Sequence, residues 1–244
     1  MKQFFTTIFY QPLFNLLVWL YNLVGGNIAL AIILLTVIIK LVLYPFSRQS
    51  LKSQKALQEI QPKINELKIK YKDDKEKMTK EMMQLYRQEK VNPFSSCLPL
   101  LIQLPFLIAV FQVFRTGLNS DSFELLYSFV ASPGHLDAFM FSFDLSQPVW
   151  LFGVLAGIAQ YWQTKMLMSK KPAVKSDGSK DEGMAATMNK QMLYFMPVLT
   201  VVFGFSLPGG LMLYWFMNTI LTVAQQYLMF GKKKVIPEPN VTTQ

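Results

Sequence analysis

The sequence contains very few of the side chains that catalyse reactions or bind metal ions. It has one cysteine, Cys97, and one histidine, His135, among 244 residues. A single cysteine excludes a disulfide within the chain. A single histidine, placed in a loop, excludes a Ser/His/Asp triad or a histidine metal cluster within a membrane span. We therefore expect no catalytic residue, no metal and no cofactor, and we do not expect an enzyme.

Charge is also scarce wherever apolar residues are dense. Hydrophobic residues make up 52% of the chain and charged residues 16%. No Asp or Glu lies inside any of the long apolar runs, and residues 117–147 contain no Lys or Arg. Several of these runs approach the length of a membrane-crossing helix. The fold class that this composition predicts is an all-α polytopic membrane protein.

The apolar stretch 28–46 has the length of a helix that crosses about 30 Å of hydrocarbon. Lys40 interrupts it, and a charge at mid-depth costs about 2.5–3.5 kcal/mol on insertion scales. Two interpretations remain open. The ammonium group either reaches the headgroups along its flexible stem, or it faces a hydrated cavity on the same helix face as Thr36 and Tyr44.

The remaining apolar and polar segments predict the organisation of the whole chain. The regions are an N-terminal interfacial amphipathic helix at 1–26, spans at 27–47, 93–116, 148–168, 188–207 and 208–230, a helical hairpin at 48–92, an outer loop at 117–147, a linker at 169–187 and a basic tail at 231–244. The interfacial helix is expected from about Pro12 to Leu23, and the alternative is that this first segment also spans.

The distribution of Lys and Arg predicts the orientation. Nearly all of them lie in 48–91, 169–187 and 231–244, so these segments are expected on the cytoplasmic side. This leaves the N-terminus outside, and it explains the net charge of +9 by orientation and contact with anionic lipid. The charged hairpin is either a solvated surface without a partner or a docking site.

Polar side chains recur at helical spacing on three of the predicted spans. They are Thr36 and Lys40; Gln160, Gln163 and Thr164; and Tyr214, Asn218, Thr222 and Gln225, with Trp215 and Gln226 alongside. Each group alone is typical of hydrogen bonding between helices. Together, around a lysine with no carboxylate in any span, they favour a hydrated groove in which water or an arriving anion satisfies Lys40.

Six motifs carry a resemblance to a known family. They are Leu41-Val-Leu-Tyr-Pro45, Gln61-Pro62, Glu89-Lys-Val-Asn-Pro93, Cys97-Leu-Pro-Leu-Leu-Ile-Gln-Leu-Pro105, Gln163-Thr-Lys-Met166 and Pro208-Gly-Gly-Leu-Met-Leu-Tyr-Trp215. Over about residues 10–230, the chain resembles the YidC/Oxa/Alb family of membrane protein insertases.

The resemblance implies five core helices around a groove that is open to the cytoplasm and the lipid but closed outside, with a cytoplasmic hairpin. The family usually has arginine where this chain has Lys40, which keeps the charge and loses the guanidinium fork. The residues expected to line the groove are Lys40, Thr36, Gln163, Tyr214, Trp215 and Asn218.

The function that the resemblance implies is insertion and folding of membrane proteins in the plasma (inner) membrane of a bacterium. The partners implied are nascent membrane proteins, the ribosome with its RNA, signal recognition machinery, the Sec translocon and anionic lipid. Basic residues expected to contact clients or the ribosome are Lys52, Lys55, Lys63, Lys68, Lys232, Lys233 and Lys234. The alternative is a small transporter or anion channel with its site at Lys40; paired intramembrane charges or an internal repeat would favour it, and the sequence contains neither.

Overall fold

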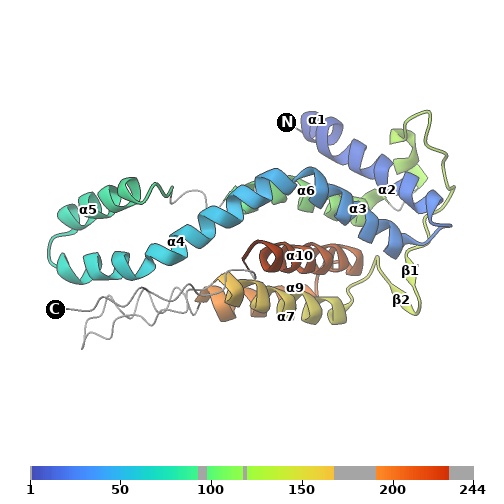
Figure 1. Ribbon diagram of the computed structural model, residues 1–244. Coiled ribbons are helices and arrows are strands. Elements are labelled where there is room, and N and C mark those ends of the chain that lie inside the picture. The colour runs from blue at the N-terminus through green and yellow to red at the C-terminus, as the bar shows by residue number, and fades with distance from the viewer. Residues whose placement is uncertain (1, 93–97, 118–119, 168–190, 231–244) are drawn as a thin grey trace.

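The computed structural model of the protein describes residues 2–92, 98–117, 120–167 and 191–230 (Figure 1). Most of these residues are helical, which confirms the predicted all-α class at that level. Within the described ranges, extended structure is limited to one antiparallel pair, β1 (Phe139–Met140) and β2 (Phe143–Asp144).

The N-terminal helix begins earlier than its sequence predicts. Helix α1 (Lys2–Phe5), a π-helical stretch (Thr6–Tyr10) and α2 (Gln11–Leu23) follow one another without a gap. Pro12 therefore lies within a continuous helix instead of starting one, directly after the wider π turn. Gly25 and Gly26 end the helix with φ of +71° and +83°, a conformation that glycine adopts without strain.

A sharp bend divides the stretch that was expected to form one straight span at 27–47. Helix α3 (Ile28–Val42) ends before Leu43, and α4 (Tyr44–Lys70) leaves at an angle of 71°. Pro45 explains the bend because it has no N–H to donate to the turn before it, and in a continuous helix its ring would clash with the carbonyl of Leu41, four residues earlier. The 15 residues of α3 rise about 22 Å, less than the hydrocarbon thickness.

The charged hairpin consists of α4 and α5 (Lys75–Gln88). Asp74 caps α5, because its carboxylate accepts a hydrogen bond of 2.9 Å from the Lys77 N–H. Ile60, Ile64 and Leu85 form a small apolar core between the two helices, separate from the main core. Figure 1 shows the hairpin extending from one end of the molecule, opposite β1 and β2.

Four further segments complete the helical body. They are α6 (Leu98–Gln112) with the π-helical Val113–Gly117, α7 (Trp150–Leu167), α9 (Met196–Phe203) preceded by the π-helical Gln191–Phe195, and α10 (Gly209–Phe230). Helix α10 packs on α7 and on α3; α7 packs in turn on α9, and α3 on α2 (Figure 1). This arrangement places α10 between the pair α7–α9 and the pair α2–α3.

Glycines allow the closest helix contacts. A Cβ atom on Gly153 of α7 would lie 2.6 Å from the Cα atom of Gly204, which follows α9. A Cβ atom on Gly210, at the start of α10, would overlap the buried ring of Phe114. Gly153 therefore lets the backbones of α7 and α9 touch, and Gly210 lets the Phe114 ring lie directly against the backbone of α10. No larger residue fits at either position.

The loop between α6 and α7 covers one end of this body. It contains a 3-10 helix (Ser120–Leu125) and buries Leu136 and Leu145 almost completely. The N–H groups of Gly209 and Gly210 donate to the carbonyls of Gln147 and Leu145 at 2.8 and 2.9 Å. The loop therefore satisfies the first backbone donors of α10, which have no partner within the helix.

Helix length alone does not establish the five predicted spans. Of the described helices, only Gln3–Leu23 is by itself long and apolar enough to cross a membrane; the bent pair α3–α4 is a second candidate. Gln103–Arg115 and Leu193–Phe203 are apolar but shorter. The interfacial placement of residues 1–26 and the five-span topology therefore remain predictions. The linker 169–187 and the tail 231–244 lie outside the described residues, as do 93–97 and 188–190 of the predicted spans.

Candidate functional site around Lys40

Lys40 lies in the last turn of α3, where an apolar helix carries its only charge. The side chain is half-buried, and α3 is otherwise packed through residues such as Ile32 and Leu35. A cation in the last turn also interacts favourably with the helix dipole. The position is therefore compatible with a charged ammonium group, provided that its N–H donors have partners.

Two neutral side chains of α10 supply those partners. The Nζ atom of Lys40 donates to Oδ1 of Asn218 at 3.0 Å and to Oγ1 of Thr222 at 2.8 Å. Asn218 and Thr222 are one turn apart, so both point from the same face of α10 toward α3. Thr222 in turn donates to the carbonyl of Asn218 at 2.7 Å, which fixes its oxygen toward the ammonium group.

No acidic residue contacts Lys40 in the described part of the chain, where the one ion pair is Lys63–Glu89. Two hydrogen bonds to neutral oxygens leave the positive charge uncompensated. An ammonium group has three donors, so the site retains both charge and hydrogen-bonding capacity for an anionic ligand. This is the chemical property that the sequence predicts for Lys40.

Thr36 and Tyr214 were expected beside Lys40, and both are buried, but their hydrogen bonds lead elsewhere. The Thr36 hydroxyl donates to the carbonyl of Ile32 at 2.7 Å, within its own helix. The side-chain amide of Gln103 on α6 donates to the hydroxyl oxygen of Tyr214. Tyr214 thus joins α6 to α10 one turn before Asn218, and it supports the helix that holds the site.

Gln163 and Trp215 are half-exposed and do not hydrogen-bond to Lys40. The Trp215 ring packs on Phe203 of α9, with 6.4 Å between ring centroids. Of the polar residues predicted on α7, it is Gln160 that makes an interhelical contact, because Thr200 of α9 donates to its side-chain oxygen. The structure therefore joins Lys40 to Asn218 among the predicted residues and leaves the role of Gln163 and Trp215 as a prediction.

The polar stripe of α10 continues past Thr222 toward α4. Ser47 donates to Oε1 of Gln225 at 2.8 Å. The side chain of Gln226 is fully buried, and neither polar atom of its amide has a hydrogen-bond partner in the described part of the chain. Thr222 and Gln225 were recognisable in the sequence from their helical spacing with Asn218, whereas Ser47 carried no such signal.

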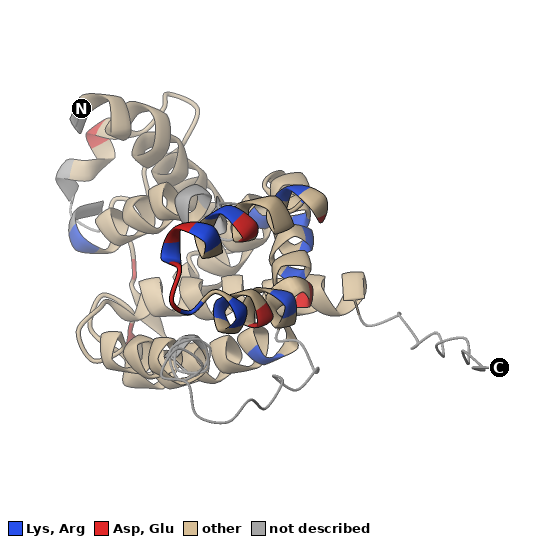
Figure 2. Cartoon of the chain, turned by 90° about the vertical axis from the view of Figure 1, so that its left-hand side faces the viewer, with Lys and Arg blue, Asp and Glu red and all other residues tan. Residues whose placement is uncertain are grey.

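The basic residues of the hairpin differ in how freely they can bind a partner. Figure 2 shows that Lys and Arg gather on the hairpin, while most of the helical body is free of charge. Lys63 pairs with Glu89 at 2.5 Å, and the ammonium group of Lys55 lies 4.2 Å from the ring centre of Phe230. Lys52 and Lys68 make neither kind of contact in the described residues, and Lys232, Lys233 and Lys234 lie outside them.

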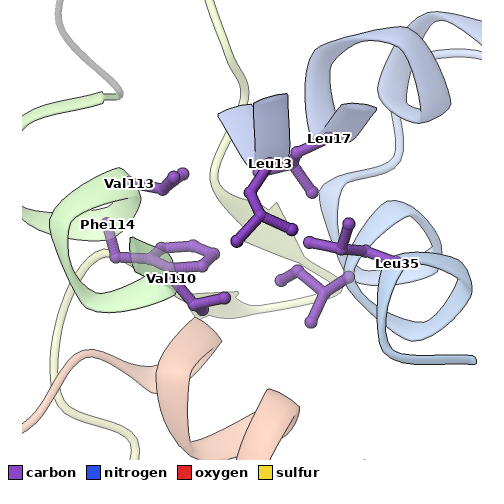
Figure 3. A pocket seen from close by; sticks show the side chains of 7 residues that line it. Leu13, Leu17, Leu35, Val110, Val113 and Phe114 are labelled. Atoms are coloured by element: carbon purple, nitrogen blue, oxygen red, sulfur yellow. The ribbon is translucent and has the colours of Figure 1, made fainter. Parts of the chain in front are cut away.

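An apolar cavity of about 10 Å³ is enclosed between α2, α3 and α6, and none of its lining residues belongs to the Lys40 site (Figure 3). Its volume is at the lower limit of what one water molecule needs, and its apolar lining gives water no hydrogen-bond partner. Its lining residues are Leu13, Leu17, Ile32, Leu35, Val110, Val113 and Phe114. We assign it to core packing.

Comparison with known proteins gives an independent result. A model of the family described as 60Kd inner membrane protein matches residues 19–235. The chain is 37% identical over 223 residues to the membrane protein insertase YidC of Anaeromyxobacter sp. (strain Fw109-5), which covers 91% of this chain and 36% of that protein. It is 35% identical over 222 residues to the protein of that name from Haemophilus ducreyi, covering 90% and 36%.

A relative of similar length is the protein of the same name from Fusobacterium nucleatum. It is 32% identical over 207 residues, which cover 85% of this chain and 88% of that protein. The chain thus spans a little over a third of the two longer relatives and most of this shorter one.

Proposed function

The chain belongs to the 60Kd inner membrane protein family, and from this premise we propose that it inserts client helices into a bacterial inner membrane without covalent chemistry. The observation that carries the proposal is the uncompensated ammonium group of Lys40, held at the α3–α10 contact by Asn218 and Thr222. The insertase name of the relatives described above agrees with it.

The surface of the helical body supports a membrane location. Large apolar side chains are exposed one turn apart on α7, at Ile158 (60%) and Trp162 (62%), and on α9, at Val198 (61%) and Val202 (53%). In water such a surface would promote association, whereas in lipid it is the expected one. We propose that the N-terminus lies outside and that the hairpin and the C-terminus lie in the cytoplasm.

The short helices suit this function. Helices shorter than the hydrocarbon thickness are accommodated by local thinning of the bilayer. α3 has 15 residues and α9 has 8, extended by five π-helical residues. We propose that thinning, together with water at the polar stripe of α10, shortens the apolar distance that a client must cross. The buried and unpaired amide of Gln226 supports hydration there, because such a group gains most from water.

Lys40 attracts the acidic or polar segment that a client must move to the outside. The hydrogen bonds from the ammonium group to Asn218 and Thr222 are already charge-assisted and contribute about 1.5–3 kcal/mol each. A client carboxylate adds a Coulomb attraction that these neutral oxygens lack, so it can replace Asn218 or Thr222 as the partner of the ammonium group. The client's apolar helix then leaves into lipid, driven by roughly 25 cal/mol per Å² of apolar surface.

The hairpin and the basic tail are the proposed docking elements for clients, the ribosome and the targeting machinery, alone or beside a Sec translocon. Of the four hairpin lysines expected to contact clients or the ribosome, Lys52 and Lys68 are the better suited, because they form neither an ion pair nor a cation–π contact in the described residues. Lys55 and Lys63 already have aromatic and acidic partners.

Substitution of Lys40 tests the proposal directly. In proteoliposomes, Lys40→Glu and Lys40→Gln are expected to reduce insertion of a client with an acidic outer segment by about tenfold or more, while Lys40→Arg retains it, because only the charge is required. Lys165→Glu is the matched control, since Lys165 is an exposed lysine of α7 that does not contact α10 side chains at the site. Normal insertion by Lys40→Glu would refute the electrostatic step. Anion flux through empty proteoliposomes without insertion would instead favour a channel.

A further inference from the structure

The turn between β1 and β2 carries an unusual group of exposed aromatic residues. Phe141 is 95% exposed, and its neighbours Phe139 and Phe143 are 57% and 39% exposed. The strands pair Phe139 with Asp144 and Met140 with Phe143, so Phe141 and Ser142 are the two residues at the tip. Ser142 is the one polar residue at this tip, and the side-chain surface around it is aromatic.

The backbone at the tip makes the choice of phenylalanine still less favourable. Phe141 has a φ of +53°, a left-handed conformation that bulky residues rarely adopt. Two-residue hairpin turns of this kind normally have glycine or asparagine where φ is positive. Packing does not explain the residue either, since the side chain is exposed. A strained and exposed apolar residue points to a function outside the fold of the chain itself.

The hairpin is fixed to the helical body, so the direction of its tip is defined. Phe143 packs on Phe152 of α7 with 6.3 Å between ring centroids. The Asp137 N–H donates to the hydroxyl of Tyr21 at 3.0 Å. Trp150, the first residue of α7, is 57% exposed and lies on the same helix face as Ile158, so the apolar surface of α7 that we place in lipid extends to the end of the helix where Phe152 holds the tip.

From these observations we infer that the β1–β2 tip is a membrane anchor that inserts Phe141 into the outer interface of the bilayer. The inference rests on the proposed membrane location of the helical body. Aromatic side chains are the residues that favour this interface. The anchor binds by apolar contact and not by charge, because residues 117–147 contain no Lys or Arg and the carboxylates of Asp137 and Asp144 accept hydrogen bonds from Phe139 and Ser146.

A single fluorescent label tests the inference in the full chain. The background is Cys97→Ser, and the environment-sensitive label NBD is attached after Phe141→Cys, in phosphatidylcholine vesicles with or without doxyl-labelled lipid. Ile158→Cys on α7 is the lipid reference, and Asp73→Cys in the α4–α5 turn is the water reference. The expected result is blue-shifted emission and quenching by doxyl lipid at positions 141 and 158, unchanged when phosphatidylglycerol is added.

The label at position 158 distinguishes failure of the anchor from failure of the proposed membrane location. Quenching at 158 with water-like emission at 141 would overturn the anchor and leave the proposed membrane location standing. Water-like emission at both positions would overturn the membrane location itself.

A second set of variants separates anchoring from folding of the turn. With NBD attached after Ser142→Cys, the additional change Phe141→Gly is expected to reduce quenching by doxyl lipid, although glycine suits the turn better. Phe141→Leu is expected to preserve the quenching, because the apolar side chain is retained. Equal quenching with Gly and Leu would show that Phe141 does not anchor the tip.

Discussion

At the scale of single residues, the site is defined by a lysine that neutral oxygens satisfy. Asn218 and Thr222 present two acceptors one turn apart, which suits a compact ammonium group. A guanidinium group has five donors in a rigid fork, so Lys40→Arg would keep the charge and need water for the donors that this pair leaves unsatisfied. The α10 residues that face position 40 therefore suit a lysine.

A double-mutant cycle tests this pairing. Thr222→Val is expected to lower stability by about 1–3 kcal/mol in the native background, because it leaves the half-buried ammonium group without one of its acceptors. In a Lys40→Met background the same change should cost markedly less, since no ammonium group remains. The measurement is thermal or denaturant unfolding in detergent micelles.

Thr219→Val is the control for this cycle. Thr219 is also buried, and its hydroxyl donates to the Trp215 carbonyl at 2.8 Å within α10, away from Lys40. Its cost should be the same in both backgrounds. Equal costs for Thr222→Val in the two backgrounds would show that Thr222 does not stabilise Lys40.

At the scale of helices, two glycine contacts set the packing and predict different responses. Gly153→Ala brings a methyl group against the backbone at Gly204, and Gly210→Ala brings one against the ring of Phe114. Each is expected to lower the free energy of unfolding by about 1–3 kcal/mol, measured as a lower unfolding temperature. Phe114→Leu should partly rescue Gly210→Ala, because a smaller side chain makes room. It should not rescue Gly153→Ala; rescue of both would mean that the two contacts are not independent.

The bend between α3 and α4 also has a testable cause. Pro45→Ala restores a backbone N–H that can donate within the helix, so α3 and α4 should become straighter. Nitroxide labels at Leu34 and Glu59, on either side of the bend, should then report a longer distance by pulsed electron resonance. Pro62→Ala is the control, because α4 is already continuous through Pro62. An unchanged distance would show that packing, not Pro45, produces the bend.

The sequence predicted those parts of the site that depend on helical periodicity. The spacing of Asn218 and Thr222 placed them on one face, and the structure brings that face to Lys40. The sequence could not show that the Thr36 hydroxyl donates to the Ile32 carbonyl instead of facing Lys40. A threonine in a helix can always bond the carbonyl four residues earlier, and spacing does not distinguish this bond from one to another helix. The sequence analysis also did not predict the bend at Leu43. The apolar run continues through this residue and indicated one span, although Pro45 disfavours a helical conformation at the residue before it.

At the scale of the whole molecule, the hairpin and the helical body are separate structural units. The core of Ile60, Ile64 and Leu85 shares no buried residue with the main core. Deletion of residues 53–89 is therefore expected to leave the unfolding temperature of the body within a few degrees, since about 2–4 °C corresponds to 1 kcal/mol in a protein of about 150–250 residues. Insertion of clients into proteoliposomes should fall, because their docking element is lost.

A milder variant controls for the loss of chain in that experiment. Replacing Lys52 and Lys68 with Gln keeps the hairpin core and removes two of its unpaired positive charges, and it should reduce insertion in part. If the protein without residues 53–89 inserted clients as well as the native protein does, the hairpin would be a solvated surface without a partner.

The contact between Gly153 and Gly204 also limits how the helical body can deform. Gly157 of α7 is similarly close to α9, because a Cβ atom there would lie 2.9 Å from the Pro197 carbonyl oxygen. Thr200 of α9 also donates to the side-chain oxygen of Gln160. The two helices are therefore joined at successive turns, and a polypeptide that enters the helical body is expected to displace α7 and α9 together as one unit.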